Sequence, residues 1–264
     1  MTMTARWFRF KYELMLCILL LILFQVDTVI QFVMFRIIGI QYDSIAAHIA
    51  AILLHALIFA TVIGVGLYDQ KKSLVDVSHF KKSGIAVFSA ATLCSIGFIL
   101  LLFYLDHLAY RIFTGFFVLP SGDYLNRFLP VIIINSCLIP AVAEELLFKG
   151  VIFTGLKKRY SQKTAVIISS VFFAVCHLNP AMLINHFLFS ICTFWLYLRT
   201  GSIFFPMMIH FTTNLFATVL IAEPFSSPVT LLAAQIIFWL GFLMLYKATE
   251  KKEVIKVPEE EKTL

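Results

Sequence analysis

Long apolar segments alternate with short polar connections along the whole chain of 264 residues. Each segment is close to the roughly 20 residues that an α-helix needs to cross the hydrocarbon core of a bilayer. The connections between them are too short for a separate soluble domain. The pattern predicts an all-α polytopic membrane protein with about eight transmembrane helices enclosing a polar intramembrane cavity. The predicted spans are 14–38, 45–67, 85–109, 128–156, 163–178, 181–198, 202–222 and 228–247.

Composition agrees with this pattern. Hydrophobic residues make up 61% of the chain and charged residues 14%, whereas soluble domains are usually about 45–50% apolar and about 25% charged. The five cysteines lie within apolar segments without CxxC spacing, which favours buried thiols over a redox or metal site. We expect one integral-membrane domain over residues 1–247, with a motif-bearing core at 128–222 and a charged cytoplasmic tail at 248–264.

Lysine and arginine are distributed unevenly between the two sides of the predicted membrane. If the N-terminus is cytoplasmic, 17 of the 21 basic residues lie on that side and three on the other, with Lys149 inside a span. Because basic residues concentrate in cytoplasmic loops, we expect both termini in the cytoplasm. The short loops are typical of a protein of the prokaryotic plasma membrane. The lipid bilayer, rather than nucleic acid, accounts for the net charge of +6.

Three of the later spans carry ionisable or amide side chains where a bilayer disfavours them. In two of these spans, a four-residue spacing places a histidine and a second residue on one helix face. The pairs are Phe173 with His177 and His210 with Asn214. Because every buried polar group needs a partner away from lipid, a single converging site is the simplest explanation. The polar residues concerned are Glu144, Glu145, His177, His210 and Asn214, and Phe173 shares the helix face of His177.

These residue types suffice to hydrolyse a peptide bond without a covalent intermediate. A glutamate and a histidine can hold a water and accept its proton as a general base. A histidine with an asparagine can donate hydrogen bonds to the oxyanion that forms at the attacked carbonyl. A serine nucleophile has no visible context, since no GxSxG occurs. Cys176 adjoins His177, but adjacent side chains on a helix do not face each other.

Zinc is the alternative within the same residues. Glu144, His177 and His210 could bind the ion and leave an open position for water. Against this stands the absence of HExxH, the element that places two ligands and a base on one helix. We therefore expect no cofactor, with zinc as the alternative, and this expectation also rests on the family resemblance given below.

The two adjacent glutamates are predicted to have different partners. Lys149 follows Glu145 by four residues, a spacing that favours Glu-to-Lys pairing along a helix. We expect Lys149 to neutralise Glu145. Glu144, about 100° around the helix, then has no local partner and is the predicted catalytic base.

Polar residues in the first two spans are interpreted as structural. His48 and His55 are seven residues apart and share a helix face, which is consistent with packing or a wet crevice. Asp27 has no obvious partner on its own helix, so we interpret it as one side of a hydrogen bond between helices.

The later motifs resemble those of the CAAX prenyl protease and bacteriocin-processing family of intramembrane proteases, also called the ABI or bacteriocin self-immunity family. The family motifs EExxxR, FxxxH and HxxxN/D correspond in order to Glu144–Lys149, Phe173–His177 and His210–Asn214. Each motif alone is short, but three in family order on predicted membrane helices are specific. The resemblance covers about residues 128–222, and the first three spans and the tail carry no motif.

The resemblance implies an eight-helix membrane protein whose polar cavity cuts a peptide near the membrane surface. It implies that Glu144 and His177 activate the water and that His210 and Asn214 bind the oxyanion. It also implies a glutamate-type protease that needs no metal. On this basis the residues Glu145, Lys149 and Phe173 have supporting roles.

Two features depart from the family pattern. Lys149 replaces the family arginine, which keeps the charge but loses the planar fork that holds a carboxylate at two points. The span 181–198 lacks the glycines common there and has Ser190, Cys192 and Thr193 instead, so its helix would approach its neighbours less closely. All four implied catalytic residues are present, and we therefore expect an active enzyme.

Three functions are compatible with these observations. The first is an intramembrane endopeptidase that acts on a peptide or membrane-protein substrate in maturation or in bacteriocin self-immunity. The second is a non-catalytic membrane immunity or regulatory protein of the same fold, which binds a peptide or a sensor partner. The third is a proton-coupled transporter, against which stands the absence of an internal repeat. The sequence identifies neither the substrate nor the oligomeric state.

Overall fold

The computed structural model describes residues 11–39, 44–78, 80, 84–112, 128–219 and 227–250. All regular secondary structure in these ranges is helical, which confirms the prediction of an all-α fold. The elements outside the central segment are α1 (Lys11–Phe32), η2 (Val33–Ile37), α2 (Ile45–Gln70), α3 (Leu74–Val77), α4 (Ile85–Ile112), α8 (Gln162–Cys176), η6 (Pro180–Met182), α9 (Leu183–Thr200), α10 (Phe204–Val219) and α11 (Pro228–Glu250).

Each predicted span overlaps one of the helical segments. Six segments are long and apolar enough to cross a membrane, and Gln162–Cys176 is a shorter apolar helix. The chain is therefore an integral membrane protein, and eight crossings stay a prediction. Helix α11 continues to Glu250, and the rest of the predicted tail lies outside the described residues. The six long segments are Lys11–Phe32, Ile45–Gln70, Ile85–Leu102, Phe128–Lys157, Pro180–Thr200 and Val229–Glu250.

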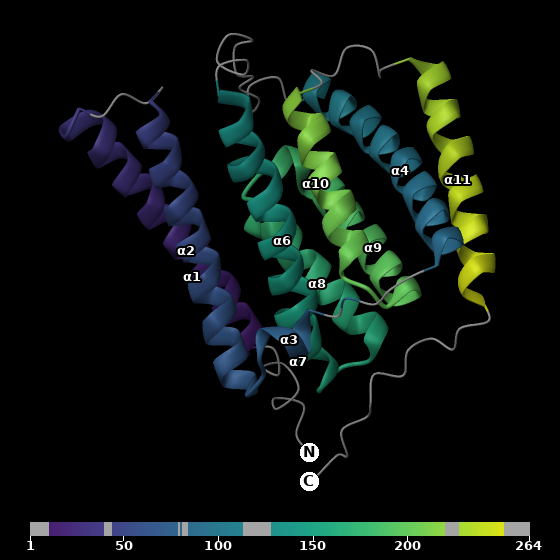
Figure 1. Cartoon of the computed structure of the whole chain (residues 1–264), viewed down its shortest axis with the longest axis horizontal. Coiled ribbons are helices and arrows are strands. Elements are labelled where there is room, and N and C mark those ends of the chain that lie inside the picture. The colour runs from purple at the N-terminus through teal and green to yellow at the C-terminus, as the bar shows by residue number, and fades with distance from the viewer. Residues whose placement is uncertain are drawn as a thin grey trace.

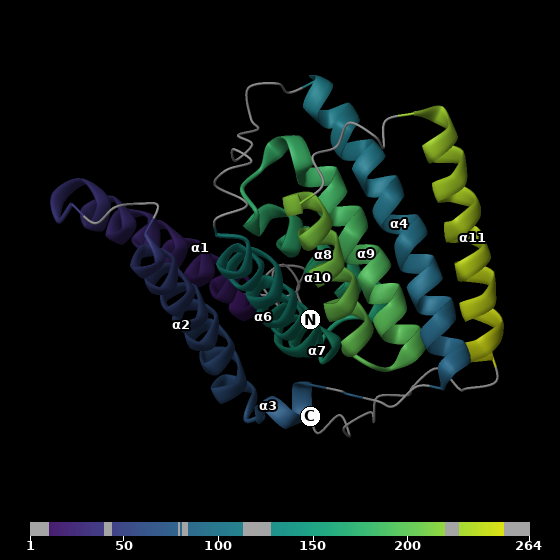
Figure 2. The ribbon, with the colours of Figure 1, turned by 45° about the horizontal axis from the view of Figure 1, so that its top comes forward.

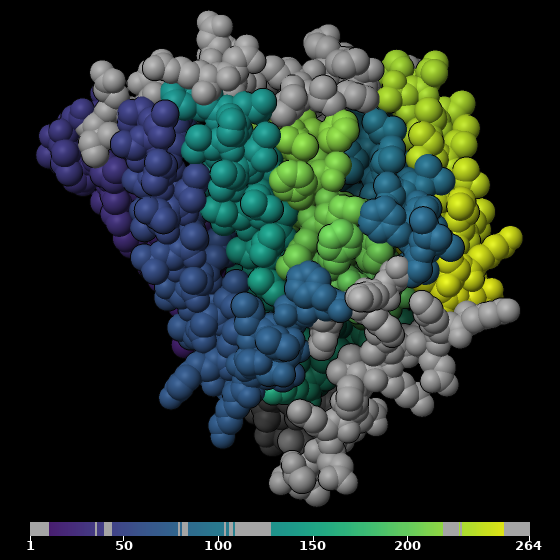
Figure 3. All heavy atoms as spheres, viewed as in Figure 1, coloured from purple at the N-terminus to yellow at the C-terminus, as the bar shows by residue number. Residues whose placement is uncertain are grey.

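The helices stand side by side in one bundle (Figure 1). Helices α1 and α2 pair on one side and α4 and α11 on the other, with α8, α9 and α10 between them, as a second view also shows (Figure 2). Across the face in Figure 3, α2 is followed by the central segment, then α10, α4 and α11. The first residues of α1 and the last of α11 lie at the same end of the bundle.

Two π-helical stretches interrupt the α-helical winding of the central segment Phe128–Lys157. Its elements are η4 (Ile133–Leu138), α6 (Ile139–Glu145), η5 (Leu146–Ile152) and α7 (Phe153–Lys157), of which η4 and η5 are π-helical. Pro140 cannot donate to the turn before it and its ring crowds that turn, which explains the wider winding at η4. Glu144 and Glu145 thus lie between two π-helical stretches, a type of distortion that is frequent at functional sites.

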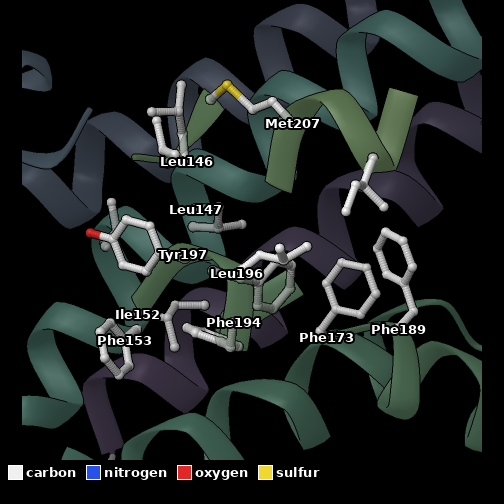
Figure 4. Close-up of a cluster of buried hydrophobic side chains, with 14 of the residues drawn as sticks. Leu146, Leu147, Ile152, Phe153, Phe173, Phe189, Phe194, Leu196, Tyr197 and Met207 are labelled. Atoms are coloured by element: carbon white, nitrogen blue, oxygen red, sulfur yellow. The ribbon is translucent and has the colours of Figure 1, made fainter. Parts of the chain in front are cut away.

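A core of aromatic and aliphatic side chains surrounds the central segment. Phe173 on α8 is 2% exposed, and its ring centroid lies 5.2 Å from that of Phe148 and 5.8 Å from that of Phe189. Figure 4 shows Phe173 and Phe189 next to each other in this core. The motif phenylalanine is therefore a packing residue, and it holds α8 against η5 and α9.

A tight connection joins α8 to α9, as the Asn179-Pro180 pair predicts. Helix α8 ends with His177 as its C-cap, and Leu178 takes a left-handed backbone conformation with φ of 49°. The Asn179 side chain then accepts a hydrogen bond from the main-chain N–H of Met182 at 3.3 Å, which starts η6. This connection turns α9 back against α8.

Candidate active site

Four elements bring the predicted site residues together. Glu144 and Glu145 end α6, and Lys149 follows on η5. His177 caps the end of α8, while α10 carries the third motif. The residues that meet through side-chain contacts are Glu144, Glu145, Lys149, His177 and His210.

Glu145 is buried between two basic partners. Its side chain forms an ion pair with Lys149 one turn further along, the pairing that the spacing predicts. Its Oε1 atom lies 3.0 Å from Nδ1 of His210 on α10. Glu145 and Lys149 are each only 1% exposed. A buried carboxylate is tolerated when it has charged and hydrogen-bonding partners, and Glu145 has both.

Lys149 has a second anchor on α9. Its Nζ atom donates a hydrogen bond of 3.0 Å to Oγ1 of Thr193 and lies 4.5 Å from the centre of the Phe194 ring. Such a position over an aromatic face is favourable for a cation. Thr193 lies in the span where the family commonly has glycines, and its hydroxyl also serves as a hydrogen-bond acceptor for Lys149. It receives the charged group that stands where the family has arginine.

Glu144 faces two imidazoles across the helices. Its Oε2 atom lies 3.7 Å from Nε2 of His177 and 3.9 Å from Nε2 of His210. Both distances exceed those of direct hydrogen bonds. Within the described residues this oxygen has no hydrogen-bond partner, and the Glu144 side chain is 14% exposed. Catalytic contacts are often long before substrate binds, so this spacing suits a group that shares a third molecule with the histidines.

Main-chain and carboxylate acceptors orient both imidazoles. Nδ1 of His177 lies 2.7 Å from the Phe173 carbonyl oxygen, which can only accept, so Nδ1 carries the hydrogen. Nδ1 of His210 likewise donates to Glu145 when that carboxylate is ionised. Each ring consequently presents its Nε2 atom to Glu144.

Asn214 is less closely connected. It lies one helical turn beyond His210 on α10 and is half-buried. In the described part of the chain, its side-chain amide makes no hydrogen bond, and its main-chain carbonyl accepts from Thr218. The structure thus places Asn214 on the same helix face as His210 without a direct contact to the glutamates.

The residues named for the zinc alternative, Glu144, His177 and His210, lie near one another at this site. Among the described residues, no group of three or more His, Cys, Asp or Glu side chains is arranged to hold a metal ion. The zinc alternative stays an untested prediction.

His186 on α9 is a further ionisable residue at this site, and it lies outside the three sequence motifs. Its ring stacks on that of His177 with a centroid distance of 3.9 Å and an angle of 24°. The ring also meets Phe173 edge-on at 6.4 Å. A histidine inside an apolar span was the available signal. Its position against His177 depends on the turn between α8 and α9.

A second polar cluster lies between α1, α2 and η4. Nε2 of His55 lies 3.0 Å from Oδ2 of Asp27, and Nδ1 of His55 lies 2.8 Å from Oδ1 of Asn135. Gln31 donates to the same Asp27 oxygen at 2.8 Å. The predicted hydrogen bond of Asp27 between helices is thereby confirmed. His48 packs elsewhere, against the Phe128 ring at 4.6 Å.

Comparison with known proteins identifies the motif-bearing part of the chain. Residues 126–216 match the family described as type II CAAX prenyl endopeptidase, Rce1-like. This part of the chain is therefore similar to the CAAX protease family, as the three motifs predict. The three motifs of the CAAX protease family lie within the matched residues, whereas α1, α2, α4 and α11 lie outside them.

One curated relative supports the same assignment. It is described as "Putative membrane peptidase YdiL" from Bacillus subtilis (strain 168) and is 28% identical over 116 residues. The match covers 44% of this chain and 48% of the relative, so the chain spans about half the length of that protein. No solved structure matches the chain.

Proposed function

We propose that the protein is an intramembrane endopeptidase in which Glu144 and His177 activate a water that attacks a peptide carbonyl. The observation that carries this proposal is the arrangement of Glu144, whose Oε2 atom faces Nε2 of both His177 and His210. The match to a CAAX endopeptidase family and to a membrane peptidase supports the same activity.

The attacking water meets two acceptors. Glu144 offers a carboxylate oxygen, and His177 offers the Nε2 lone pair because its Nδ1 hydrogen is committed to the Phe173 carbonyl. The water oxygen bonds to the carbonyl carbon while one water proton passes to Glu144. The π electrons of the carbonyl move to its oxygen and make an oxyanion. Glu144 then returns the proton to the departing amide nitrogen as the carbon–nitrogen bond breaks.

His210 stabilises the oxyanion as an imidazolium. Its Nδ1 hydrogen points to Glu145, so Nε2 can donate only when it also carries a hydrogen. When His210 is protonated, the buried group contains two carboxylates, those of Glu144 and Glu145. Lys149 and His210 are its two cations. Proton transfer to Glu144 neutralises one carboxylate as the oxyanion appears, so the net charge of the site stays zero throughout. Asn214, one turn beyond His210, supplies a second donor to the oxyanion.

No metal takes part in this mechanism, which makes the enzyme a glutamate-type protease. The substrate is a peptide or membrane protein cut during maturation or bacteriocin self-immunity. The protein lies in a bacterial plasma membrane with both termini in the cytoplasm. The shared location of the start of α1 and the end of α11 supports termini on one side, and the Bacillus relative supports a bacterial membrane.

Comparison of membrane-associated peptides tests the proposal. Cells that produce the wild-type protein are compared with cells that produce Glu144→Gln at the same level. We expect at least one peptide to appear only with the wild type, and its uncut precursor to accumulate with the variant. If the two profiles agree, and if His177→Ala and His210→Ala also preserve the cellular phenotype, a non-catalytic immunity or regulatory protein is the correct description.

A further inference from the structure

The rings of His177 and His186 form a close stack between two helices. Their centroids are 3.9 Å apart and their planes differ by 24°. His186 lies in the first turn of α9, and the turn through Leu178 and Asn179 returns it to the end of α8. The contact therefore joins a motif residue to one outside the three motifs.

His177 is restrained from three directions. Its Nδ1 atom bonds to the Phe173 carbonyl oxygen at 2.7 Å, the Phe173 ring lies 4.6 Å from its ring, and His186 covers a ring face. The His177 side chain is still 25% exposed. The hydrogen bond alone leaves the ring free to tilt about the axis through Nδ1, and the ring of His186 limits that movement.

What His186 contributes at this position is its ring face. Its Nδ1 atom is buried and has no hydrogen-bond partner among the described residues. Because the two rings are nearly parallel, their nitrogen lone pairs lie in separate planes and do not meet at one point. A direct hydrogen bond from one ring to the other and joint ligation of an ion are both excluded by this geometry.

We propose that His186 is a positioning residue for the hydrolysis, because its ring face keeps Nε2 of His177 directed at the water that Glu144 holds. This inference rests on the proposed function. A displacement of about 1 Å in a catalytic group can reduce a rate by about 100-fold, so the stack has a measurable consequence.

Two substitutions separate the ring face from its nitrogens. His186→Ala removes both, whereas His186→Phe keeps an aromatic face of similar size. The assay uses a quenched fluorogenic peptide with the cleavage sequence found in the Glu144→Gln comparison, and the full-length protein in lipid nanodiscs. We expect Ala to lower kcat about tenfold or more with KM changed less than about twofold. We expect Phe to restore kcat to within about threefold of the wild type.

His48 provides a matched control, because it too packs its imidazole on an aromatic ring, that of Phe128, with a centroid distance of 4.6 Å. His48→Ala should leave kcat unchanged while testing the general effect of losing a packed imidazole. The proposal is overturned if His186→Ala has wild-type kcat, or if His186→Phe is as slow as Ala although both proteins are folded. A wild-type rate for Glu144→Gln would instead contradict the proposed function itself.

Discussion

Glu145 accepts a hydrogen bond from Nδ1 of His210 at 3.0 Å, and so links the central helix to α10. Glu145 thus orients the imidazole of His210, and Glu144 faces the other nitrogen of the same imidazole. Lys149 compensates the charge of Glu145 from the same helix. The adjacent glutamates consequently differ in their surroundings. Glu145 is paired within a buried network, whereas Oε2 of Glu144 has no hydrogen-bond partner among the described residues and faces that network across His210.

Substitution of the two glutamates should separate catalysis from stability. Glu144→Gln should abolish cleavage with little change in thermal stability, because Oε2 of Glu144 has no hydrogen-bond partner in the described residues. Glu145→Gln should destabilise the protein, since it leaves Lys149 buried without its carboxylate. The fraction of protein that stays monodisperse after heating in detergent measures the second effect. Loss of activity in Glu145→Gln with full activity in Glu144→Gln would refute the assignment.

The ion pair between Glu145 and Lys149 should show strong coupling. Lys149→Met leaves a buried carboxylate uncompensated, a change that typically costs about 3–5 kcal/mol. The double variant Glu145→Gln with Lys149→Met removes both charges and should recover much of that loss. Unfolding of the two single variants and the double variant in mixed micelles gives the coupling free energy. If the free-energy changes of the two single variants simply add in the double variant, the ion pair has no coupling free energy.

Thr193 should matter for the position of Lys149. Thr193→Val keeps the shape of the side chain but removes the oxygen that Nζ of Lys149 donates to, and hydrogen bonds to charged groups contribute about 1.5–3 kcal/mol. We expect a lower midpoint of thermal unfolding, and recovery in Thr193→Ser. Thr200→Val is a matched control on the same helix, because its hydroxyl also donates to a main-chain carbonyl but accepts from the main-chain N–H of Ser202 rather than from a charged side chain. Equal losses at both positions would mean that Lys149 does not depend on Thr193.

Cleavage should survive removal of metal ions. The proposed mechanism uses Glu144, His177 and His210 without a Lewis acid, so treatment with 1,10-phenanthroline and EDTA should leave kcat/KM unchanged. Metal analysis of the purified enzyme provides a second measurement. Reversible inhibition by the chelators, restored by zinc and accompanied by about one zinc per chain, would establish the metalloprotease alternative.

The sequence determined those features that depend on the bilayer or on one helix alone. Apolar lengths located the helical segments because a membrane helix must satisfy its own backbone in lipid. The cost of polar groups in lipid singled out Glu144, His177 and His210 as candidates. The pairing of Glu145 with Lys149 was predictable because their spacing is that of one helical turn.

Which polar groups meet across helices depends on how the helices pack. The contact of Glu145 with His210, the anchoring of Lys149 by Thr193 and the bond of Asp27 to His55 join residues that are distant in the sequence. Such contacts depend on helix packing, and the π-helical stretches beside α6 also rotate the side chains away from regular positions.

The stack of His186 on His177 likewise depends on the fold rather than on a sequence pattern. Nine positions separate the two residues, and no helical periodicity relates them, because a helix ends and another begins between them. The left-handed backbone at Leu178 and the capping of η6 by Asn179 set the return of the chain. The sequence therefore determined which residues are costly to bury in a membrane, and the packing of the helices decided which partners offset that cost.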